Sequence, residues 1–582
     1  MWDSNNRPNN SEIIQLAVRQ SVTNLEDSIK TPTAPASSFF PKVWDYTPIA
    51  SDPATKAIVD KAVSIYTDPT NPELLKKAIE LVKASSKCFS ERSKTQARSG
   101  ARTPAGGDNV VTSRKITAGM KAPILLTEGD VNLSAERTRW NEELDTKTKR
   151  SLGEDTSSFL HQSLSTPCLD VLESCEGIWL TDMSGRKYMD FHGNNVHQIG
   201  HRNPFVIERI KRQLDTLPFS PRRFTNQPAI DAAQRLAGLL PKGLDRVLFA
   251  PGGTSAVSMA LKLARIVTGK QKLVSYIDSF HGASLDAITA GGEEQFRKYM
   301  GPLHPDTIHI PGPESYRTTQ STDTSGSDRP PQSTDASGSD SNPGIDYAGL
   351  LEQAIINDGN IGAFIAETIR NTDVQIPTKE YWQKVRAICT RHKVLLILDE
   401  IPIAFGRTGA MFAFEHYGIE PDIICLGKGL GAGLIPFAAM IAREEYNIAG
   451  DVSLGHFTHE KSPLGSAAAL GMLDFIRDQK ILEKVKEDEP WIRDQLTSLK
   501  QKHPLIGDIR GIGMLWGIEL VLDPVTKEKA TAKADQVLYD CLRNGLSFKV
   551  SQGNVLQLSP PLTITRTQWS HAIDIIDKSL ER

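Results

Sequence analysis

A lysine among glycines and an aspartate, each at the end of an apolar run, are the residues of this sequence best suited to catalysis. Lys428 lies in PDIICLGKGLGAGLIP, and Asp399 ends the earlier run VLLILD. A buried lysine loses its charge readily and becomes a nucleophilic amine that can form an imine. An aspartate at the end of a strand can hold a proton on a pyridine nitrogen. The pair therefore predicts a site for pyridoxal phosphate (PLP).

A glycine-rich turn before a helix offers a place for the phosphate of that cofactor. Gly252, Gly253 and Thr254 follow the apolar segment VLFA and open a long helical pattern. Backbone N–H groups at a helix N-terminus form an anion site. An ordinary strand-to-helix turn is the alternative interpretation.

Short apolar strands alternate with amphipathic helices from about residue 122 onward. The segments RVLFA, KLVSYI, IGAFIAE, VLLILDE and DIICLG are each followed by helix-like or glycine-rich sequence. This alternation predicts an α/β fold with a mostly parallel sheet.

Segments in the same order resemble the class III PLP-dependent aminotransferases, a family of fold-type I. They are FAPGGTSAVSMALKLAR (249–265), SFHG (279–282), DEIPIAFGRTG (399–409), LGKGLGAGLIP (426–436) and FTHEKSPLGSAAA (457–469). The resemblance covers about residues 122–582 and implies a PLP-dependent enzyme. It implies a large, mostly parallel-sheet cofactor domain (about 201–469) and a smaller α+β domain (about 122–200 and 470–582).

The resemblance also assigns expected roles to single residues. Lys428 is the predicted catalytic residue, which holds the cofactor and then acts as a general base. Thr458 matches a threonine that reaches the cofactor phosphate across a dimer interface, which implies a homodimer with shared active sites. The predicted cofactor-binding residues are Gly253, Thr254, Phe280, His281, Glu367, Asp399, Ile401, Lys428 and Thr458.

Several of these assignments have plain structural alternatives. Phe280 and Ile401 are expected on the two faces of the pyridine ring, but both residue types are equally typical of a core. Asp399 can also serve as a helix N-cap, and Glu367 can be a surface glutamate.

Departures from the family pattern bear on the substrate. Family members that act on α-amino acids commonly carry an arginine shortly before PPL, where the segment NVLQLSPPL has Gln557 instead. Pro402 replaces a polar residue, and Glu460 and Lys461 replace two glycines. The usual clamp for an α-carboxylate is therefore expected to be missing.

Other charges are available for a dianionic substrate. The predicted substrate-binding residues are Arg222, Arg223, Asn194, Asn195 and Lys461, with His197 nearby in sequence. Two arginines and a lysine suit a dianion better than a single carboxylate. Solvated loop residues are the alternative interpretation for Arg222, Arg223 and Lys461.

The motifs HGNNVH, PRRFTN, DEIP and THEKSPLG resemble a subgroup of the family that acts on small aminophosphonates. This predicts an amino-lyase that releases ammonia from a 1-hydroxy-2-aminoethylphosphonate-like amine. The alternatives are an ω-aminotransferase that uses a keto acid and a catalytically silent PLP-binding protein. A nicotinamide dehydrogenase, suggested by GKGLGA, is disfavoured because no acidic strand end occurs at the required spacing.

Composition limits the remaining possibilities. The net charge of -3 gives no electrostatic case for nucleic acid or an anionic membrane. The 6 cysteines form no CxxC pair, which argues for reduced thiols and against a metal site. Without a visible signal sequence or an apolar run long enough for a membrane helix, a cytoplasmic location is expected.

Two regions are expected to lie outside the catalytic fold. Residues 1–121 form an extension that is predicted to be partly disordered, with short helices in ATKAIVDKAVSIY and PELLKKAIELVKASS. Residues of about 317–343 contain QSTDTSGSD and QSTDASGSD, a near repeat. Such polar sequence buries too little surface to offset its ordering entropy, so a disordered insertion is predicted.

Overall fold

The computed structural model describes residues 134–162, 167–317 and 345–582. The predicted N-terminal extension and its two helices, together with most of the predicted insertion, lie outside the described residues. Residues Lys121–Arg582 belong to one compact unit. The boundaries predicted between a small and a large domain within that unit stay a prediction.

A 7-stranded sheet forms the centre of this unit and runs in the order β4-β10-β9-β8-β7-β5-β6. β10 runs antiparallel to its neighbours, and the other pairs are parallel. This confirms the predicted α/β fold. The strands are β4 (Leu244–Ala250), β5 (Lys272–Tyr276), β6 (Thr307–Ile310), β7 (Ile361–Glu367), β8 (Leu395–Asp399), β9 (Ile423–Leu426) and β10 (Ala438–Arg443).

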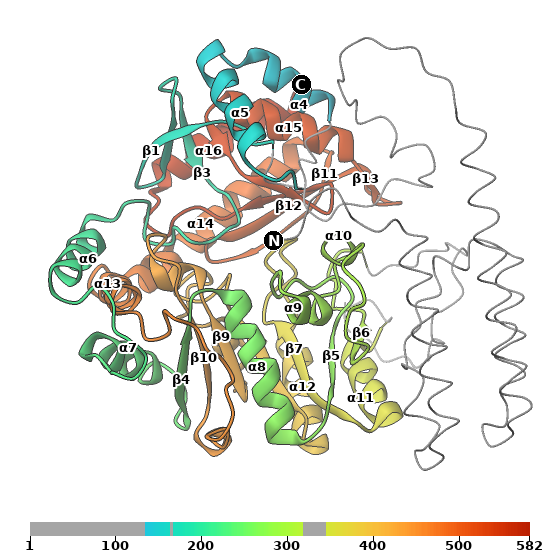
Figure 1. The fold of residues 1–582 in the computed structure, drawn as a ribbon. Helices are drawn as coiled ribbons and strands as arrows, with labels where there is room; N and C mark the ends of the chain where they lie inside the picture. The colour runs from blue at the N-terminus through green and yellow to red at the C-terminus, as the bar shows by residue number, and fades with distance from the viewer. Residues whose placement is uncertain (1–133, 163–166, 318–344) are drawn as a thin grey trace, which may run out of the picture. The chain divides into compact units, whose positions relative to one another are not determined.

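Helices cover both faces of this sheet, which explains why its strands are apolar throughout rather than alternating. Ile365 and Ile397 share a core with α8 (Gly253–Thr268), whereas their neighbours Phe364 and Leu396 share one with α12 (Lys379–His392). Figure 1 shows α8 in front of the strands and α12 behind them. Successive residues of each strand therefore face opposite cores.

Two smaller sheets complete the described fold. The first has the order β1-β2-β3-β14 and joins β1 (Leu172–Glu176), β2 (Trp179–Asp182) and β3 (Lys187–Asp190) to β14 (Leu546–Ser547). The second has the order β11-β12-β16-β15, with β13 paired to β12. Its strands are β11 (Ile506–Ile512), β12 (Leu515–Asp523), β13 (Glu528–Lys529), β15 (Lys549–Ser551) and β16 (Val555–Leu558).

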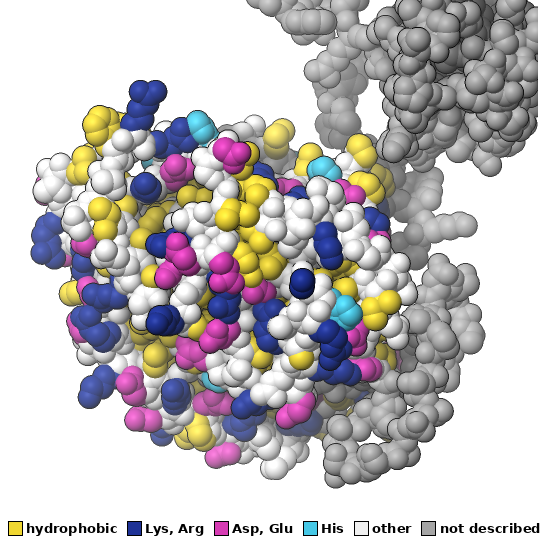
Figure 2. Space-filling model, turned by 90° about the horizontal axis from the view of Figure 1, so that it is seen from below, with side chains coloured by type: hydrophobic (Ala, Val, Ile, Leu, Met, Phe, Trp, Pro, Cys, Tyr) yellow, Lys and Arg dark blue, Asp and Glu magenta, His cyan; other side chains and the backbone are white. Residues whose placement is uncertain are grey.

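The remaining helices pack around these sheets, and Figure 1 shows α14, α15 and α16 beside the smaller ones. They are α4 (Ala135–Glu143), α5 (Thr146–Ser158), α6 (Pro204–Thr216), α7 (Gln227–Ala237), α9 (Leu285–Ala290), α10 (Glu294–Arg297), α11 (Tyr347–Asp358), α13 (Pro463–Asp478), α14 (Ile481–Lys502), α15 (Thr531–Arg543) and α16 (Arg566–Leu580), with short 3-10 helices η3 (Ala413–Tyr417), η4 (Lys428–Gly431) and η5 (Glu444–Tyr446). Among the described residues, no helix has the length and apolar content that crossing a membrane requires. On the face drawn in Figure 2, basic and acidic side chains are interspersed.

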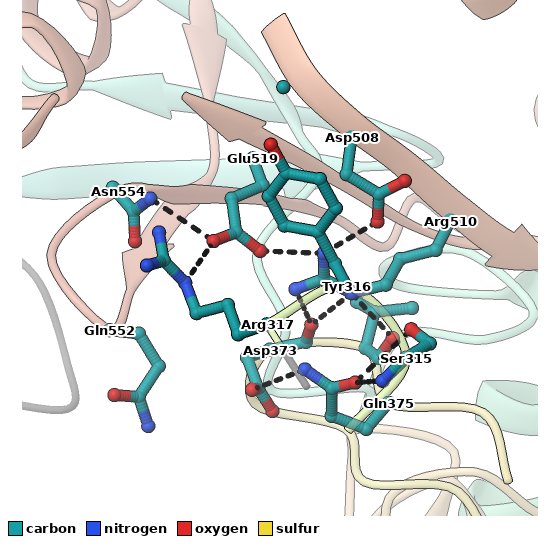
Figure 3. A network of polar contacts seen from close by, with 12 residues as sticks. Ser315, Tyr316, Arg317, Asp373, Gln375, Asp508, Arg510, Glu519, Gln552 and Asn554 are labelled. Atoms are coloured by element: carbon teal, nitrogen blue, oxygen red, sulfur yellow. Dashed lines mark hydrogen bonds and ion pairs between the residues drawn. The ribbon is translucent and has the colours of Figure 1, made fainter. Parts of the chain in front are cut away.

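A buried polar network joins the loop after β7 to the sheet that contains β11 and β12 (Figure 3). Arg510 of β11 donates to the backbone carbonyls of Asp373 (2.7 Å) and Val374 (3.0 Å) and to the carboxylate of Glu519 (2.7 Å). Arg317 also donates to Glu519, at 2.6 Å. Val374 has a φ of 58°, an unfavourable value for a β-branched residue, so the loop depends on this support.

We expect Arg510→Met to lower the free energy of unfolding by about 3 kcal/mol, because the carbonyls of Asp373 and Val374 lose the Arg510 donor and the buried carboxylate of Glu519 loses one of its two arginines. Urea unfolding followed by circular dichroism measures this. The matched control is Arg139→Met, which removes an ion pair with Glu136 from a side chain that is 59% exposed. The control should change stability by less than about 0.5 kcal/mol, and equal losses in the two variants would contradict the assignment.

Candidate active site

The register of the parallel strands brings the predicted site residues to one edge of the large sheet. Glu367 of β7 is the partner of Asp399 of β8, which is in turn the partner of Cys425 of β9. Lys428 comes shortly after the end of β9. Ligands of parallel α/β sheets bind at the carboxyl ends of the strands, so this edge is the candidate active site.

Lys428 lies in a strained turn rather than in a regular element. Its φ is 45°, in the left-handed region, and it is half-buried at the start of η4. Non-glycine residues adopt this conformation at a cost and are found at functional sites when their surroundings enforce it. Lys428 is thus half-buried, whereas the three residues that follow it in η4 are buried.

Gln198 braces that turn, a role that no motif of the sequence predicts. A Cβ atom on Gly429 would lie 1.2 Å from Gln198 Oε1, so only glycine fits beside the Gln198 side chain. Gln198 is buried, and its Nε2 donates to the carbonyl of Ala404 at 2.7 Å. The side chain thus links the lysine turn to the loop after Asp399.

Asp399 is held by two hydrogen bonds inside the protein. Its Oδ2 lies 2.8 Å from Nδ1 of His281, and its Oδ1 accepts from the backbone N–H of Ile401 at 3.1 Å. The Asp399 and His281 side chains are 3% and 0% exposed. A carboxylate fixed in this way can face a protonated ring nitrogen, and a helix N-cap does not account for the buried histidine.

The start of α8 lies against the same group. A Cβ atom on Gly253 would lie 2.8 Å from Cδ1 of Ile401, and one on Gly282 would lie 2.5 Å from Oγ1 of Thr254. The helix begins at Gly253, and its first N–H groups have no acceptor within the helix. Gly253, Thr254 and Ile401 therefore converge beside Asp399, at a helix terminus that suits a phosphate.

Phe280 and Ile401 differ in their environments. Ile401 is buried among the residues just described, with 8% exposure. Phe280 is 37% exposed and packs on Phe296, with ring centroids 4.5 Å apart. One aromatic face at the edge of the site is thus accessible to a ligand.

Glu367 and Glu400 are neighbouring buried carboxyl groups with different surroundings. Glu400 accepts hydrogen bonds from Thr368 Oγ1 and from the N–H groups of Ala413 and Phe414, and burial raises its pKa to about 7. Glu367 accepts one bond on Oε2, from the N–H of Asn371 at 3.0 Å. Burial, and then the negative charge of Asp399, raise the pKa of Glu367. Glu367 is therefore buried, which excludes the surface alternative.

Asn371, in the loop after β7, accepts hydrogen bonds from Asn195 and Gln557, two residues that bear on the predicted substrate. Asn195 Nδ2 donates to Asn371 Oδ1 at 2.7 Å and to the carbonyl of Pro402 at 2.7 Å. Gln557 Nε2 donates to the Asn371 carbonyl at 2.6 Å. Asn371 itself carried no sequence signal because ETIRN matches no motif. The Nδ2 group of Asn195 holds this loop, and its Oδ1 is buried without a hydrogen-bond partner. The role of Asn195 in substrate binding stays a prediction, and Asn194 is exposed.

Three predicted substrate residues and the predicted cofactor residue Thr458 form a second, exposed group on two adjacent loops. Arg222 Nη1 lies 4.0 Å from Glu460 Oε1, and Asn226 donates to the carbonyl of Lys461 at 3.0 Å. Phe219 and His459 pack edge to face at 5.3 Å. Members of this group are Arg222, Arg223, Thr458 and Lys461, all exposed on this chain.

The described residues include one group with metal-ligand chemistry. The ligand atoms of Asp190, His197 and His201 lie within 4.8 Å of one another. The His201 ring bonds Asp190 at 2.8 Å, and the rings of His197 and His201 are stacked with an interplanar angle of 4°. A metal ion lies in the plane of each imidazole that binds it, so stacked rings do not suit a shared ion. The absence of a metal site stays a prediction.

Comparison with known proteins identifies the family. The model of the class-III aminotransferase family matches residues 162–580. The chain belongs to the class III aminotransferases. It is 53% identical over 464 residues to the (R)-1-hydroxy-2-aminoethylphosphonate ammonia-lyase of Vibrio splendidus, covering 80% of this chain and 96% of the relative. It is 32% identical over 413 residues to isoleucine 2-epimerase of Lentilactobacillus buchneri, covering 70% and 89%.

Solved structures of the family have the same fold. A thermostable (S)-enantioselective ω-transaminase from Thermomicrobium roseum is 27% identical, with a TM-score of 0.66 over 74% of this chain and 98% of that one. A PLP-bound amine transaminase from an uncultivated Pseudomonas species is 28% identical, with a TM-score of 0.64 over 73% and 98%. These relatives confirm the family, the PLP cofactor and the prediction that the protein is an enzyme. The buried carboxylate, the helix terminus and the lysine turn fit PLP, while the role of each residue stays a prediction.

We expect Gly429→Ala to weaken PLP retention about tenfold or more, because the added methyl group displaces Gln198 and shifts the Lys428 turn. The visible absorbance of bound cofactor after dialysis measures the change. Gly450→Ala is the matched control, since nothing lies within 4 Å of its Cβ position. Full cofactor retention by the Gly429 variant would show that the turn tolerates the methyl group.

Proposed function

We propose that the protein is a PLP-dependent ammonia-lyase whose substrate is a 1-hydroxy-2-aminoethylphosphonate-like amine. The observation that carries this proposal is the 53% identity to the Vibrio splendidus ammonia-lyase over 96% of that protein. The uncharged, buried Gln557 near the site supports it, because a clamp for an α-carboxylate needs a cation there.

The residues at the strand ends of the large sheet are proposed to bind the cofactor and to transfer the proton. Lys428 would hold the cofactor and, once released, accept the proton from the substrate carbon next to nitrogen. Asp399, oriented by His281, would keep the ring nitrogen protonated, and the start of α8 would bind the phosphate. Phe280 and Ile401 would contact the ring. When bound, PLP supplies an electron sink for bonds next to the substrate nitrogen.

The exposed side chains on the two adjacent loops are proposed to bind the phosphonate. Arg222, Arg223 and Lys461 supply positive charge, and Asn194 supplies an amide. Glu460 lies 4.0 Å from Arg222 and offsets part of that charge. Flexible exposed cations of this kind become strong phosphonate ligands only when a neighbouring surface excludes water.

A second copy of the chain is the proposed source of that surface. Thr458 is exposed here, as expected for a residue that completes the site of a partner subunit. Large apolar side chains are exposed on α6 and on the segment after it: Phe205 (44%), Leu214 (49%), Leu217 (38%), Phe219 (40%) and Phe224 (67%). Apolar surface of this extent is typical of an interface. We therefore propose a homodimer with shared active sites, which acts in phosphonate metabolism in the cytoplasm.

An ω-aminotransferase is the second candidate. The solved structures most relevant here include amine and ω-transaminases, and the first proton transfer by Lys428 is common to both reactions. The two candidates differ in the next step of the reaction. A lyase expels the hydroxyl group and releases ammonia, whereas a transaminase needs a keto acid to regenerate the cofactor.

The wild-type enzyme should release ammonia from 1-hydroxy-2-aminoethylphosphonate over many turnovers without any keto acid. Coupled ammonia detection measures this. Lys428→Ala should lower the rate by at least about 1,000-fold, because both the cofactor linkage and the general base are lost. A single turnover that ends with the amino group on the cofactor would instead identify a transaminase.

Arg222→Ala and Lys461→Ala should each raise KM for the phosphonate substrate about tenfold, since each removes a charge-assisted hydrogen bond. KM for a neutral amine of similar size should change little. Arg150→Ala, an arginine on α5 whose side chain is 81% exposed, is the matched control. Equal effects on the phosphonate and the neutral amine would contradict a dianion site.

A further inference from the structure

Glu367 is a buried acid at the candidate active site without a role in the proposed machinery beyond contact with the cofactor. It ends β7 beside Asp399, is 6% exposed and lines a pocket that adjoins the sheet edge. Its Oε2 accepts the Asn371 N–H at 3.0 Å. Glu400, another buried acid nearby, accepts three hydrogen bonds and does not line that pocket. Of these two acids, Glu367 is thus the one that lines a pocket and accepts fewer hydrogen bonds.

The charges around Glu367 favour its neutral form. The negative charge of Asp399 disfavours the ionised form of Glu367, whereas His281 and Arg370 favour that form. Arg370, however, is paired with Asp278, with Glu293 at 3.5 Å and with Asp373 at 3.1 Å, so its charge is more than offset.

β16 carries the amide of Gln557 at the place where family members that act on α-amino acids commonly carry an arginine. Gln557 of β16 is buried and donates to the carbonyl of Asn371, the residue whose N–H bonds Glu367. The hydrogen bond that Glu367 accepts therefore comes from a neutral backbone N–H group, and Gln557 supports that group with a neutral amide. Burial and the charge of Asp399 raise the pKa of the Glu367 carboxyl, in agreement with this arrangement.

The proposed lyase reaction has a step that needs such an acid. Hydroxide is a poor leaving group, because its conjugate acid, water, is a very weak acid. The C–O bond breaks readily only if the oxygen is protonated as it leaves. Lys428 acts as a base at the neighbouring carbon, so a second group must act as the acid.

We propose that Glu367 donates the proton to the departing substrate hydroxyl, an inference that rests on the proposed lyase function. The electrons of the C–H bond broken by Lys428 form a C=C bond, and the C–O bond breaks. The oxygen leaves with its electron pair and the Glu367 proton, as water. A water molecule is then consumed when the C=N bond of the imine product is hydrolysed to a carbonyl group and ammonia. The overall reaction therefore neither gains nor loses water.

The test compares two substrates in wild type and in Glu367→Gln. Glutamine keeps the hydrogen bond from Asn371 but cannot donate the leaving-group proton. For the hydroxyl substrate, kcat of the variant should fall about 100-fold or more, with KM within about threefold. For the analogue with fluorine in place of hydroxyl, kcat should stay within about fivefold of wild type, because fluoride leaves without a proton.

The outcomes separate this role from the proposed function. Equal losses on both substrates, or a fully active variant, would overturn the role of Glu367 and leave the lyase function intact. A wild-type enzyme that releases no ammonia from the hydroxyl substrate would overturn both. Glu314→Gln is the control, since Glu314 lines the same pocket but is exposed and is not a strand neighbour of Asp399; its kcat should not change.

A readout independent of turnover is the protonation of Glu367 itself. Infrared difference spectra of the cofactor-free protein should show a carbonyl band of a protonated carboxyl group that disappears in Glu367→Gln. The band should weaken as pH rises through the Glu367 pKa, because the protonated form is then lost. The rate with the hydroxyl substrate should fall over the same pH range, and that with the fluorine analogue should not. A band that appears only at the acidic pH where an ordinary glutamate is protonated would overturn the proposal.

Discussion

The hydrogen-bonded register of three parallel strands is the constraint on which the rest of the site depends. β7, β8 and β9 end together, so Glu367, Asp399 and Cys425 are neighbours and Lys428 comes directly after them. Both faces of these strands are buried, against α8 on one side and α12 on the other. A slip of one residue would exchange the two faces of a strand, which would move Asp399 away from His281. The apolar cores therefore fix the chemistry as well as the stability.

Close packing around the lysine turn depends on glycine. Gln198 occupies the space where Gly429 would have a side chain, and Ile401 fills the corresponding space at Gly253. Side chains from distant parts of the chain can thus approach the backbone of the site directly. The resulting contacts hold Lys428 in a left-handed conformation that it would rarely adopt alone.

The loop after β7 connects the site to the smaller sheet. Arg510 holds the carbonyls of Asp373 and Val374, and Asn371 in the same loop bonds Glu367 and Gln557. A single loop therefore carries both the support from β11 and the polar contacts of the proposed proton donor. The hydrogen bonds from Arg510 to this loop offset the strain at Val374.

The sequence by itself determined the family, the α/β fold and the cofactor, because Lys428, Asp399 and the glycine turn lie in short local motifs whose order is preserved. It also located Gln557 as a departure from the family pattern. Tertiary structure decided what local motifs do not contain: the contact of Gln198 with Gly429, the use of Asn195 to bond Asn371, and the burial of Glu367 beside Asp399. These contacts join residues far apart in the chain, and their energies arise from packing and burial, which no local pattern of residues encodes.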